Sequence, residues 1–477
     1  MLFSSPIFLW YFLPVVLAIV LVAPRGWRNG IIAVASLLFY ASGAGPSTLL
    51  LLACMVVNFW AGPALEPDEW DIDRARRRLV LVGVVLFDIA VLVIWKYAGF
   101  ATEQLAAIAK LLGGDFPVVH LMLPIGISFY TFHHISYVVD IYRGERPALR
   151  NPVSFITYIA MFPQLIAGPI VRYREIADQL PQHRTHRLDD LAAGFPRFAL
   201  GLCKKVIIAD SLAPLADACF TTPSHAMTFG IAWLGAITYT LQLYFDFSGY
   251  SDMAIGLGRM LGFRLPENFA RPYSSVTITE FWRRWHMSLS RWFRDYVYVP
   301  LGGNRHGAAK TYRNLFIVFV LTGFWHGAAW TFLVWGLYHG ALLIIERGFH
   351  LEQAPESRHA VIGRRALTMV LVIVGWVFFR ATDMGSALAM IGHMLLPDFT
   401  GLTDVVDVAF TNQRLVLLLL AVVILFLPAH PVTGPMLESS RGRLATGLRI
   451  TVMTVGLAYA GILVATGTFS PFLYYQF

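Results

Sequence analysis

The sequence predicts an all-α, polytopic membrane protein, and three observations carry that prediction. Of the 477 residues, 57% are hydrophobic and only 14% are charged, whereas soluble proteins use about 25% charged residues. The mean hydropathy is +0.61. Long apolar stretches recur along the whole chain, as at residues 8–23, 79–95 and 415–427. At about 20 residues per span there is room for about ten to twelve transmembrane helices, and a soluble enzyme is excluded.

The first predicted spans alternate with arginine-rich loops. Residues 8–23 have no basic start and no small-residue cleavage site, so we expect a retained first span rather than a signal peptide. Residues 31–40, 49–61 and 79–95 are predicted as the next spans. Arginines follow the first, third and fifth spans, at residues 25–28, 74–78 and 143–150. The positive-inside rule places these loops in the cytoplasm and the N-terminus outside, and it explains the net charge of +8 without nucleic acid.

The rest of the chain is less regular. Residues 155–170 are a short apolar stretch with two prolines and with basic residues on both sides, which fits a re-entrant segment better than a crossing. The further predicted spans lie near residues 195–209, 229–244, 314–324, 331–345, 367–379, 415–427 and 448–464. The sequence shows no internal repeat, flexible linker or low-complexity tract. Residues 1–477 are therefore predicted to form a single integral-membrane domain.

Charged and aromatic side chains crowd together between residues 246 and 307, in a pattern that a lipid-facing helix would not hold. Thr277 followed by Glu280 forms a capping box and predicts a helix over residues 277–298. Periodicity gives this helix an aromatic face and an opposite arginine face, which is typical of an interfacial helix on the cytoplasmic side. The two faces carry Trp282, Trp285, His286, Leu289, Trp292, Phe293 and Tyr296, and Arg283, Arg284, Arg291 and Arg294. A membrane-surface anchor would have the same faces, but an apolar residue would suit it better than His286.

Two further histidines lie in apolar segments. His326 stands near the end of one predicted span, and His339 follows in the next. Ionisable residues inside membrane spans are rare and costly, so each is a functional hypothesis. A neutral imidazole hydrogen-bonded between helices is the alternative, which is favoured for the histidines of residues 133–134 and for His339. Gly323 and Gly327 flank His326 and would let the helix break there.

The residue types favour acyl transfer over other chemistries. A histidine in a dry pocket can act as the general base that takes the proton from an attacking hydroxyl. No nucleophile elbow, zinc-protease motif, phosphate-binding loop or dinucleotide fingerprint appears. Three histidines could bind zinc, but His326 and His339 are thirteen residues apart and would face different ways on one continuous helix. His183 and His186, a pair at ligand spacing, lie in a polar stretch, so no metal site is predicted.

Several motifs, in their order along the chain, resemble the membrane-bound O-acyltransferase family, in particular its bacterial subgroup that acetylates polysaccharides. The matching segments are residues 1–9, 124–132, 137–140, 162–172, 246–252, 281–296, 325–327 and 470–477. The resemblance implies a bundle of about eleven transmembrane helices around a thin central chamber. It implies that His326 is the family's near-invariant catalytic histidine and that His286 is a second functional one. His133 departs from the pattern, because a glutamine or other polar residue is common there.

The resemblance also implies an activity. Such proteins are multi-pass enzymes of the bacterial inner membrane that transfer acetyl groups from a cytoplasmic donor, here acetyl-CoA, to an exported polysaccharide such as alginate. They act with a periplasmic partner resembling the SGNH esterases and with the machinery that makes and exports the polymer. The arginine-rich cytoplasmic region is expected to hold the phosphates of the donor, because guanidinium groups recognise phosphate in bidentate fashion.

Other functions stay open at this point. Within the family, the acceptor could instead be cellulose, another exopolysaccharide, peptidoglycan or, by D-alanyl transfer, teichoic acid. A transporter or flippase would also carry intramembrane charges such as Asp88 and Lys96, but it would more often show two repeated halves. A structural assembly subunit is the third possibility, and it predicts that substituting His326 leaves acetylation intact.

Overall fold

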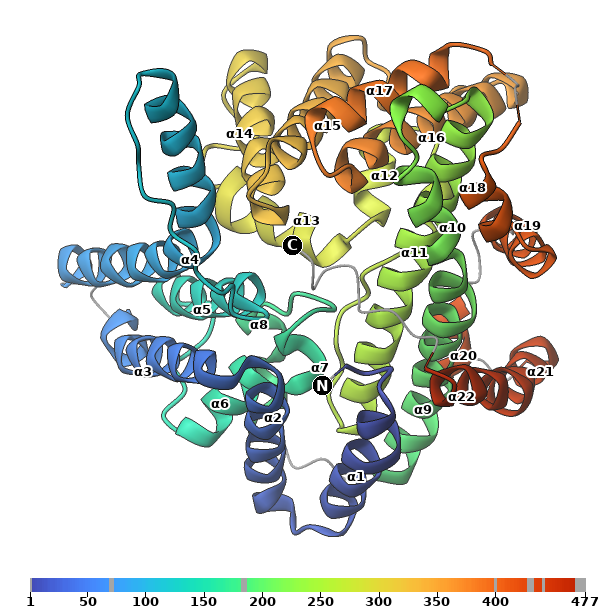
Figure 1. Cartoon of the computed structure of the whole chain (residues 1–477). Helices are drawn as coiled ribbons and strands as arrows, with labels where there is room; N and C mark the ends of the chain where they lie inside the picture. Colours follow the sequence, from blue (N-terminus) through green and yellow to red (C-terminus); the bar gives the residue numbers. More distant parts are fainter. Residues whose placement is uncertain are drawn as a thin grey trace. The chain divides into compact units, whose positions relative to one another are not determined.

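The computed structural model describes residues 2–67, 73–181, 187–398, 401–426, 433–439 and 442–467. Within these ranges the chain is helical and contains no strand, which confirms the all-α prediction (Figure 1). His183 and His186, and the motif at residues 470–477, lie outside the described residues. The chain divides into two compact units, Met1–Phe195 with Ala254–Pro266 and Pro196–Met253 with Glu267–Phe477. The single integral domain stays a prediction.

The first unit holds most of the predicted N-terminal spans. Its helices are α1 (Leu13–Val22), α2 (Arg28–Ala44), α3 (Thr48–Leu65), α4 (Arg74–Leu111), α5 (Ile127–Tyr142), α6 (Pro152–Ala160), α7 (Phe162–Leu165), α8 (Tyr173–Ile176) and the start of α9 (Arg187–Cys203). The stretches predicted at residues 31–40, 49–61 and 79–95 fall within α2, α3 and α4. The proposed re-entrant segment contains two short, largely buried helices, α6 and α7, which meet at Met161. Its course in the membrane stays a prediction.

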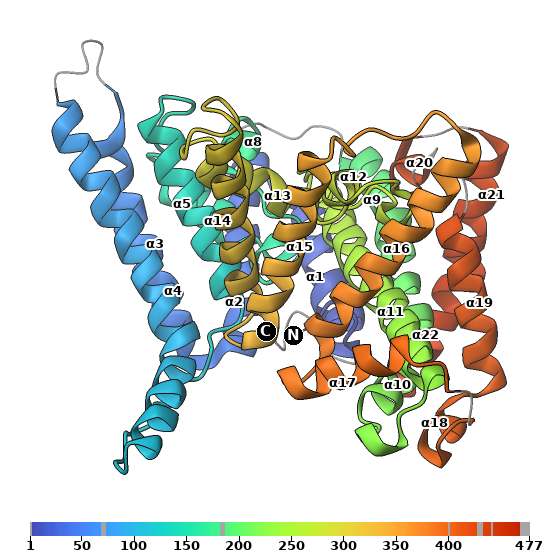
Figure 2. The same cartoon turned by 90° about the horizontal axis from the view of Figure 1, so that it is seen from above.

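The second unit contains the helices that carry the proposed chemistry. They are α10 (Asp210–Phe220), α11 (Phe229–Met260), α12 (Ile278–Arg284), α13 (Met287–Phe293), α14 (Ala308–His326), α15 (Trp330–Gly348), α16 (Arg358–Arg380), α17 (Met384–Leu395), α18 (Asp404–Ala409), α19 (Asn412–Phe426), α20 (Thr433–Ser439), α21 (Arg443–Thr451) and α22 (Leu457–Ala465). The last residues of α11 belong to the first unit. Helices α12 and α13 lie at one end of the second unit and α17 lies at the opposite end (Figure 2).

Several helices are long and apolar enough to cross a membrane. Among the described residues, four segments meet both criteria: Arg25–Leu65, Arg74–Leu111, Arg358–Arg380 and Arg443–Ala465. Large apolar side chains are exposed along them, as expected of helices whose solvent is lipid. The apolar helices thus indicate a membrane protein. The number of about eleven spans stays a prediction.

Glycine allows α14 and α15 to pack closely as an antiparallel pair. A Cβ atom added to Gly323 would collide with the carbonyl oxygen of Phe332, and one added to Gly336 would collide with that of Phe319. The two backbones therefore touch, as small residues permit in membrane helix pairs. The chain reverses at Gly327, which ends α14 with an extended backbone (φ −166°). The break expected beside His326 is confirmed.

One predicted element is wrong. The helix expected over residues 277–298 begins as predicted, since the Thr277 hydroxyl accepts the N–H of Glu280 at 3.0 Å. It ends at Arg284, however, and α13 starts only after His286, whose backbone is left-handed (φ 42°, ψ 54°). A left-handed backbone costs a residue other than glycine about 1–2 kcal/mol. The periodicity of the side chains gives no signal for such a break in the helix. Tertiary hydrogen bonds to the segment around Asn268 replace those of a continuous helix.

Candidate active site

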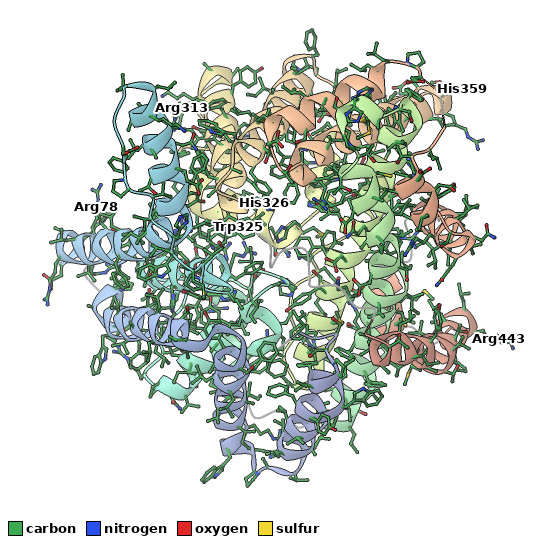
Figure 3. The ribbon with its side chains drawn as sticks, in the orientation of Figure 1. Arg78, Arg313, Trp325, His326, His359 and Arg443 are labelled. Atoms are coloured by element: carbon green, nitrogen blue, oxygen red, sulfur yellow. The ribbon has the colours of Figure 1, made fainter. Side chains whose placement is uncertain are left out.

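His326 ends α14 inside an aromatic pocket. Its side chain is 3% exposed. The rings of Trp325, Trp335 and Phe379 surround the imidazole, with centroids at 4.8, 4.9 and 5.0 Å. These residues come from α14, α15 and α16, and Figure 3 shows Trp325 and His326 at the end of α14. The pocket holds the imidazole away from bulk water, as a base in a dry site requires.

His286 lies beside the same aromatic cluster. It is 1% exposed, and its ring lies 4.6 Å from Phe247 and 5.9 Å from Trp325. The ring centroid of Trp325 lies 5.9 Å from that of His286 and 4.8 Å from that of His326. The centroids of the two imidazoles can therefore be no farther apart than the sum of these two distances. The two histidines that the sequence singles out, forty residues apart in the chain, therefore share one neighbourhood.

His339 lies near this pair but in a different setting. It is fully buried in α15, with Trp335 at 5.2 Å and Trp282 at 5.1 Å. Trp335 contacts both His326 and His339, because the chain reverses between them. The expectation that these two histidines face different ways on one continuous helix is thus wrong. Neither ring nitrogen of His339 has a hydrogen-bond partner among the described residues.

The aromatic and arginine faces of residues 277–298 survive the break in the helix. The predicted aromatic residues up to Phe293 are buried, whereas Arg283 and Arg294 are exposed and Arg284 and Arg291 are half-buried. The two short helices, α12 and α13, each bury their aromatic side, although they do not form one continuous helix. The partition that the pattern predicts is therefore confirmed, although its helical geometry is not.

A groove of about 550 Å³ runs beside these helices, between α12, α13, α14 and α15. Its polar wall carries three guanidinium groups. Its apolar wall includes Leu315, Val318 and Phe319 of α14. Trp282 and Thr322 also line it, and Thr322 lies one helical turn before His326. The groove thus has an arginine wall opposite an apolar wall; its arginines are Arg283, Arg291 and Arg294.

Buried charges along α9 and α11 are functional candidates that the sequence analysis missed. Arg197 donates to Asp252 at 2.9 Å, to Glu267 at 2.6 Å and to Glu438 at 2.9 Å. Lys204 also donates to Asp252, at 2.6 Å. The signal was present, because these cations fall within the span predicted at residues 195–209. A second buried group joins Lys205 to Asp210 and Asp246, at 2.6 and 2.7 Å.

The histidines of residues 133–134 lie in the first unit. Both are fully buried in α5. The ring of His133 lies 5.8 Å from Tyr158, and that of His134 lies 6.0 Å from Tyr130. This packing is compatible with a structural role, which stays a prediction. Among the described residues, no group of three histidine, cysteine or carboxylate side chains could hold a metal ion.

Comparison with known proteins shows clear relatives. Residues 144–386 match the family described as MBOAT, membrane-bound O-acyltransferase family. The chain is 45% identical to a probable alginate O-acetylase AlgI of Azotobacter vinelandii and 43% identical to one of Pseudomonas putida, in both cases over 100% of each chain. It is 36% identical to a peptidoglycan O-acetyltransferase of Helicobacter pylori, over 83% of this chain and 80% of the relative.

Proposed function

The chain belongs to the membrane-bound O-acyltransferase family, and from this premise we propose that it O-acetylates an exported polysaccharide such as alginate. The full-length similarity to probable alginate O-acetylases is the observation that carries the proposal. The family match indicates an O-acyltransferase rather than a transporter, a flippase or an assembly subunit. Peptidoglycan is the second candidate acceptor, because one relative is named for it. Cellulose and D-alanylated teichoic acid are further alternatives.

In this proposal His326 is the general base. Its imidazole takes the proton of the acceptor hydroxyl while the hydroxyl oxygen forms the ester bond to the acetyl carbon. The carbon–sulfur bond of the thioester breaks, and the departing thiolate receives the proton to leave as the free thiol. The buried aromatic pocket supports this role because it excludes water that would otherwise hydrolyse the thioester. His286 orients one of the reactants beside it.

The donor is proposed to be acetyl-CoA, bound in the groove between α12–α13 and α14. Its phosphates would meet the arginines of the polar wall, and its pantetheine arm would follow the apolar wall toward Thr322. Arg283 suits this role best, because it is exposed and makes no hydrogen bond or ion pair with the described part of the chain. Arg294 is by contrast paired with Asp295 at 2.7 Å.

The Arg283→Gln variant tests this donor site. We expect it to raise the KM for acetyl-CoA about fivefold and to leave kcat nearly unchanged. The binding free energy lost in this way lies between that of an exposed ion pair and that of a buried hydrogen bond to a charged group. Kinetics in inverted membrane vesicles at several acetyl-CoA concentrations would measure it. The matched control is Arg443→Gln, at an exposed arginine on α21 far from the groove residues in sequence (Figure 3). An unchanged KM, or an equal change in both variants, would contradict the assignment.

The acetyl group is proposed to leave on the periplasmic side of the inner membrane, to a partner resembling the SGNH esterases. A hollow of about 480 Å³ lies where α16 ends and α17 begins. Arg380, which lines it, directly follows Phe379 of the His326 pocket. Helix α17 lies at the opposite end of the second unit from α12 and α13 (Figure 2), which supports a path from one end to the other. Hydroxyl groups suited to a saccharide or to a polar loop line this hollow: Thr221, Thr222, Ser224, Thr382 and Ser386.

Deletion of the gene tests the function as a whole. We expect the exported polysaccharide of the deletion strain to lose its acetyl esters, and the gene supplied in trans to restore them. The measurement is the ester content of purified polymer, with peptidoglycan isolated from the same cells. Loss from peptidoglycan alone would select the second acceptor, and unchanged esters in every polymer would contradict the proposal.

A further inference from the structure

His286 occupies a position that is normally filled by a capping residue. It is the N-cap of α13, yet its side chain makes no capping hydrogen bond. Helix N-termini leave their first N–H groups without partners, and serine, threonine, aspartate or asparagine at the N-cap usually satisfies them. An imidazole placed there, in a left-handed conformation that favours glycine or asparagine, persists only if other residues hold it.

Asn268 supplies the missing cap from elsewhere in the chain. Its side-chain oxygen accepts the backbone N–H of Ser288 at 3.3 Å and the Ser288 hydroxyl at 2.8 Å. Ser288 is the second residue of α13, where a local N-cap side chain would accept its bond. The backbone oxygen of Asn268 accepts the N–H of Met287 at 2.9 Å. The capping role has thus moved from position 286 to position 268, which leaves position 286 open to an imidazole.

Asn268 is itself fixed on both sides. Its amide nitrogen donates to the Ser251 hydroxyl of α11 at 3.0 Å, and Asn268 is fully buried. The preceding residue, Glu267, is held by the buried Arg197, and its carbonyl oxygen accepts from Arg291 of α13 at 3.0 Å. Two residues after Asn268, the N–H of Ala270 donates to the carbonyl oxygen of Arg284, at the end of α12. The segment 267–270 therefore bonds to both ends of the break that contains His286.

We propose that Asn268 is a positioning residue for His286: it caps α13 in place of His286 and holds the left-handed turn that directs the imidazole toward Trp325 and His326. The side chain at position 268 must accept hydrogen bonds from Ser288 and donate one to Ser251. An amide does both without any change in its neighbours. Leucine offers similar bulk without either bond. Aspartate keeps the acceptor, and the Ser251 hydroxyl can turn to donate to it. The inference rests on the proposed function through the role given there to His286.

The test is a double-mutant cycle in the full-length protein in its native membrane. Asn268→Ala is expected to lower kcat for polymer acetylation about tenfold, with little change in the KM for acetyl-CoA, because about one capping interaction is lost. Asn268→Asp should retain more activity than Asn268→Leu. In a His286→Asn background, Asn268→Ala should change the rate less than about twofold, because no imidazole remains to be positioned.

The matched control is Asn314→Ala, which removes another fully buried asparagine, bonded to the carbonyl oxygens of Leu301 and Gly303. Any loss of acetylation rate caused by Asn314→Ala should be the same factor in the wild-type and in the His286→Asn background. Should Asn268→Ala fail to accumulate in the membrane, Ser251→Ala takes its place, since it removes only the anchor of Asn268. Multiplicative losses for Asn268→Ala, or full activity in both Asn268→Leu and Ser251→Ala, would overturn the inference. Wild-type activity of His286→Asn would instead show that the proposed role of His286 has failed.

Discussion

Replacing His326 with alanine is expected to lower acetyl transfer about 10²- to 10⁴-fold, the contribution of a general base. The imidazole sits among the rings of Trp325, Trp335 and Phe379, which hold it out of bulk water. The measurement is the acetyl content of exported polymer, normalised to the amount of protein in the membrane. A variant that keeps more than about a tenth of the activity would contradict the base role.

The same aromatic cluster offers a control for lost packing. His339→Ala removes an imidazole of equal volume that also contacts Trp335, so it should disturb the cluster to a similar degree. We expect its acetyl transfer to stay within a few-fold of wild type, although its thermal stability falls. His359→Ala, at an exposed position, should change neither (Figure 3). Equal loss of activity in the His326 and His339 variants would show that packing, not proton transfer, explains the effect.

His286 is expected to act with His326 as one unit. Removing its imidazole should cost nearly as much as His326→Ala, and the double variant should cost little more than either alone, because catalytic groups that act together are not additive. His286→Asn is the cleaner substitution, since asparagine tolerates the left-handed backbone and can cap α13 itself, whereas alanine adds strain. Initial rates of acetyl incorporation for the four proteins would measure the cycle. Strictly multiplicative losses would assign His286 to packing.

Much of the helical architecture followed from composition and local pattern. Apolar runs located α2, α3 and α4, since a membrane helix must bury its backbone bonds within itself and so shows as a continuous apolar stretch. The glycines beside His326 predicted that the helix could break there, and the structure places Gly323 in close backbone contact with α15. His286 and His326 stood out because ionisable groups are costly in such surroundings. Their proximity, by contrast, came from the resemblance and from the fold.

What could not be predicted depends on partners distant in the chain. The break at His286 is set by Asn268, eighteen residues earlier, and nothing in the periodicity of residues 277–298 signals it. The partners of Arg197 come from α11, from Glu267 and from α20, so only the fold shows how its charge is compensated. Its presence in an apolar stretch was a visible signal, because a charged side chain is costly in such surroundings unless it is paired.

The most direct measurement uses inverted inner-membrane vesicles that contain the complete acetylation machinery. Acetyl-CoA labelled in its acetyl group is added on the exposed cytoplasmic face, and the label that mild alkali releases from polymer is counted. Vesicles with the wild-type chain should form labelled esters, and vesicles with the His326→Ala chain should fall to the background of vesicles that lack the protein. Ester formation at the wild-type rate in the His326→Ala vesicles would contradict acetyl transfer through this histidine pocket.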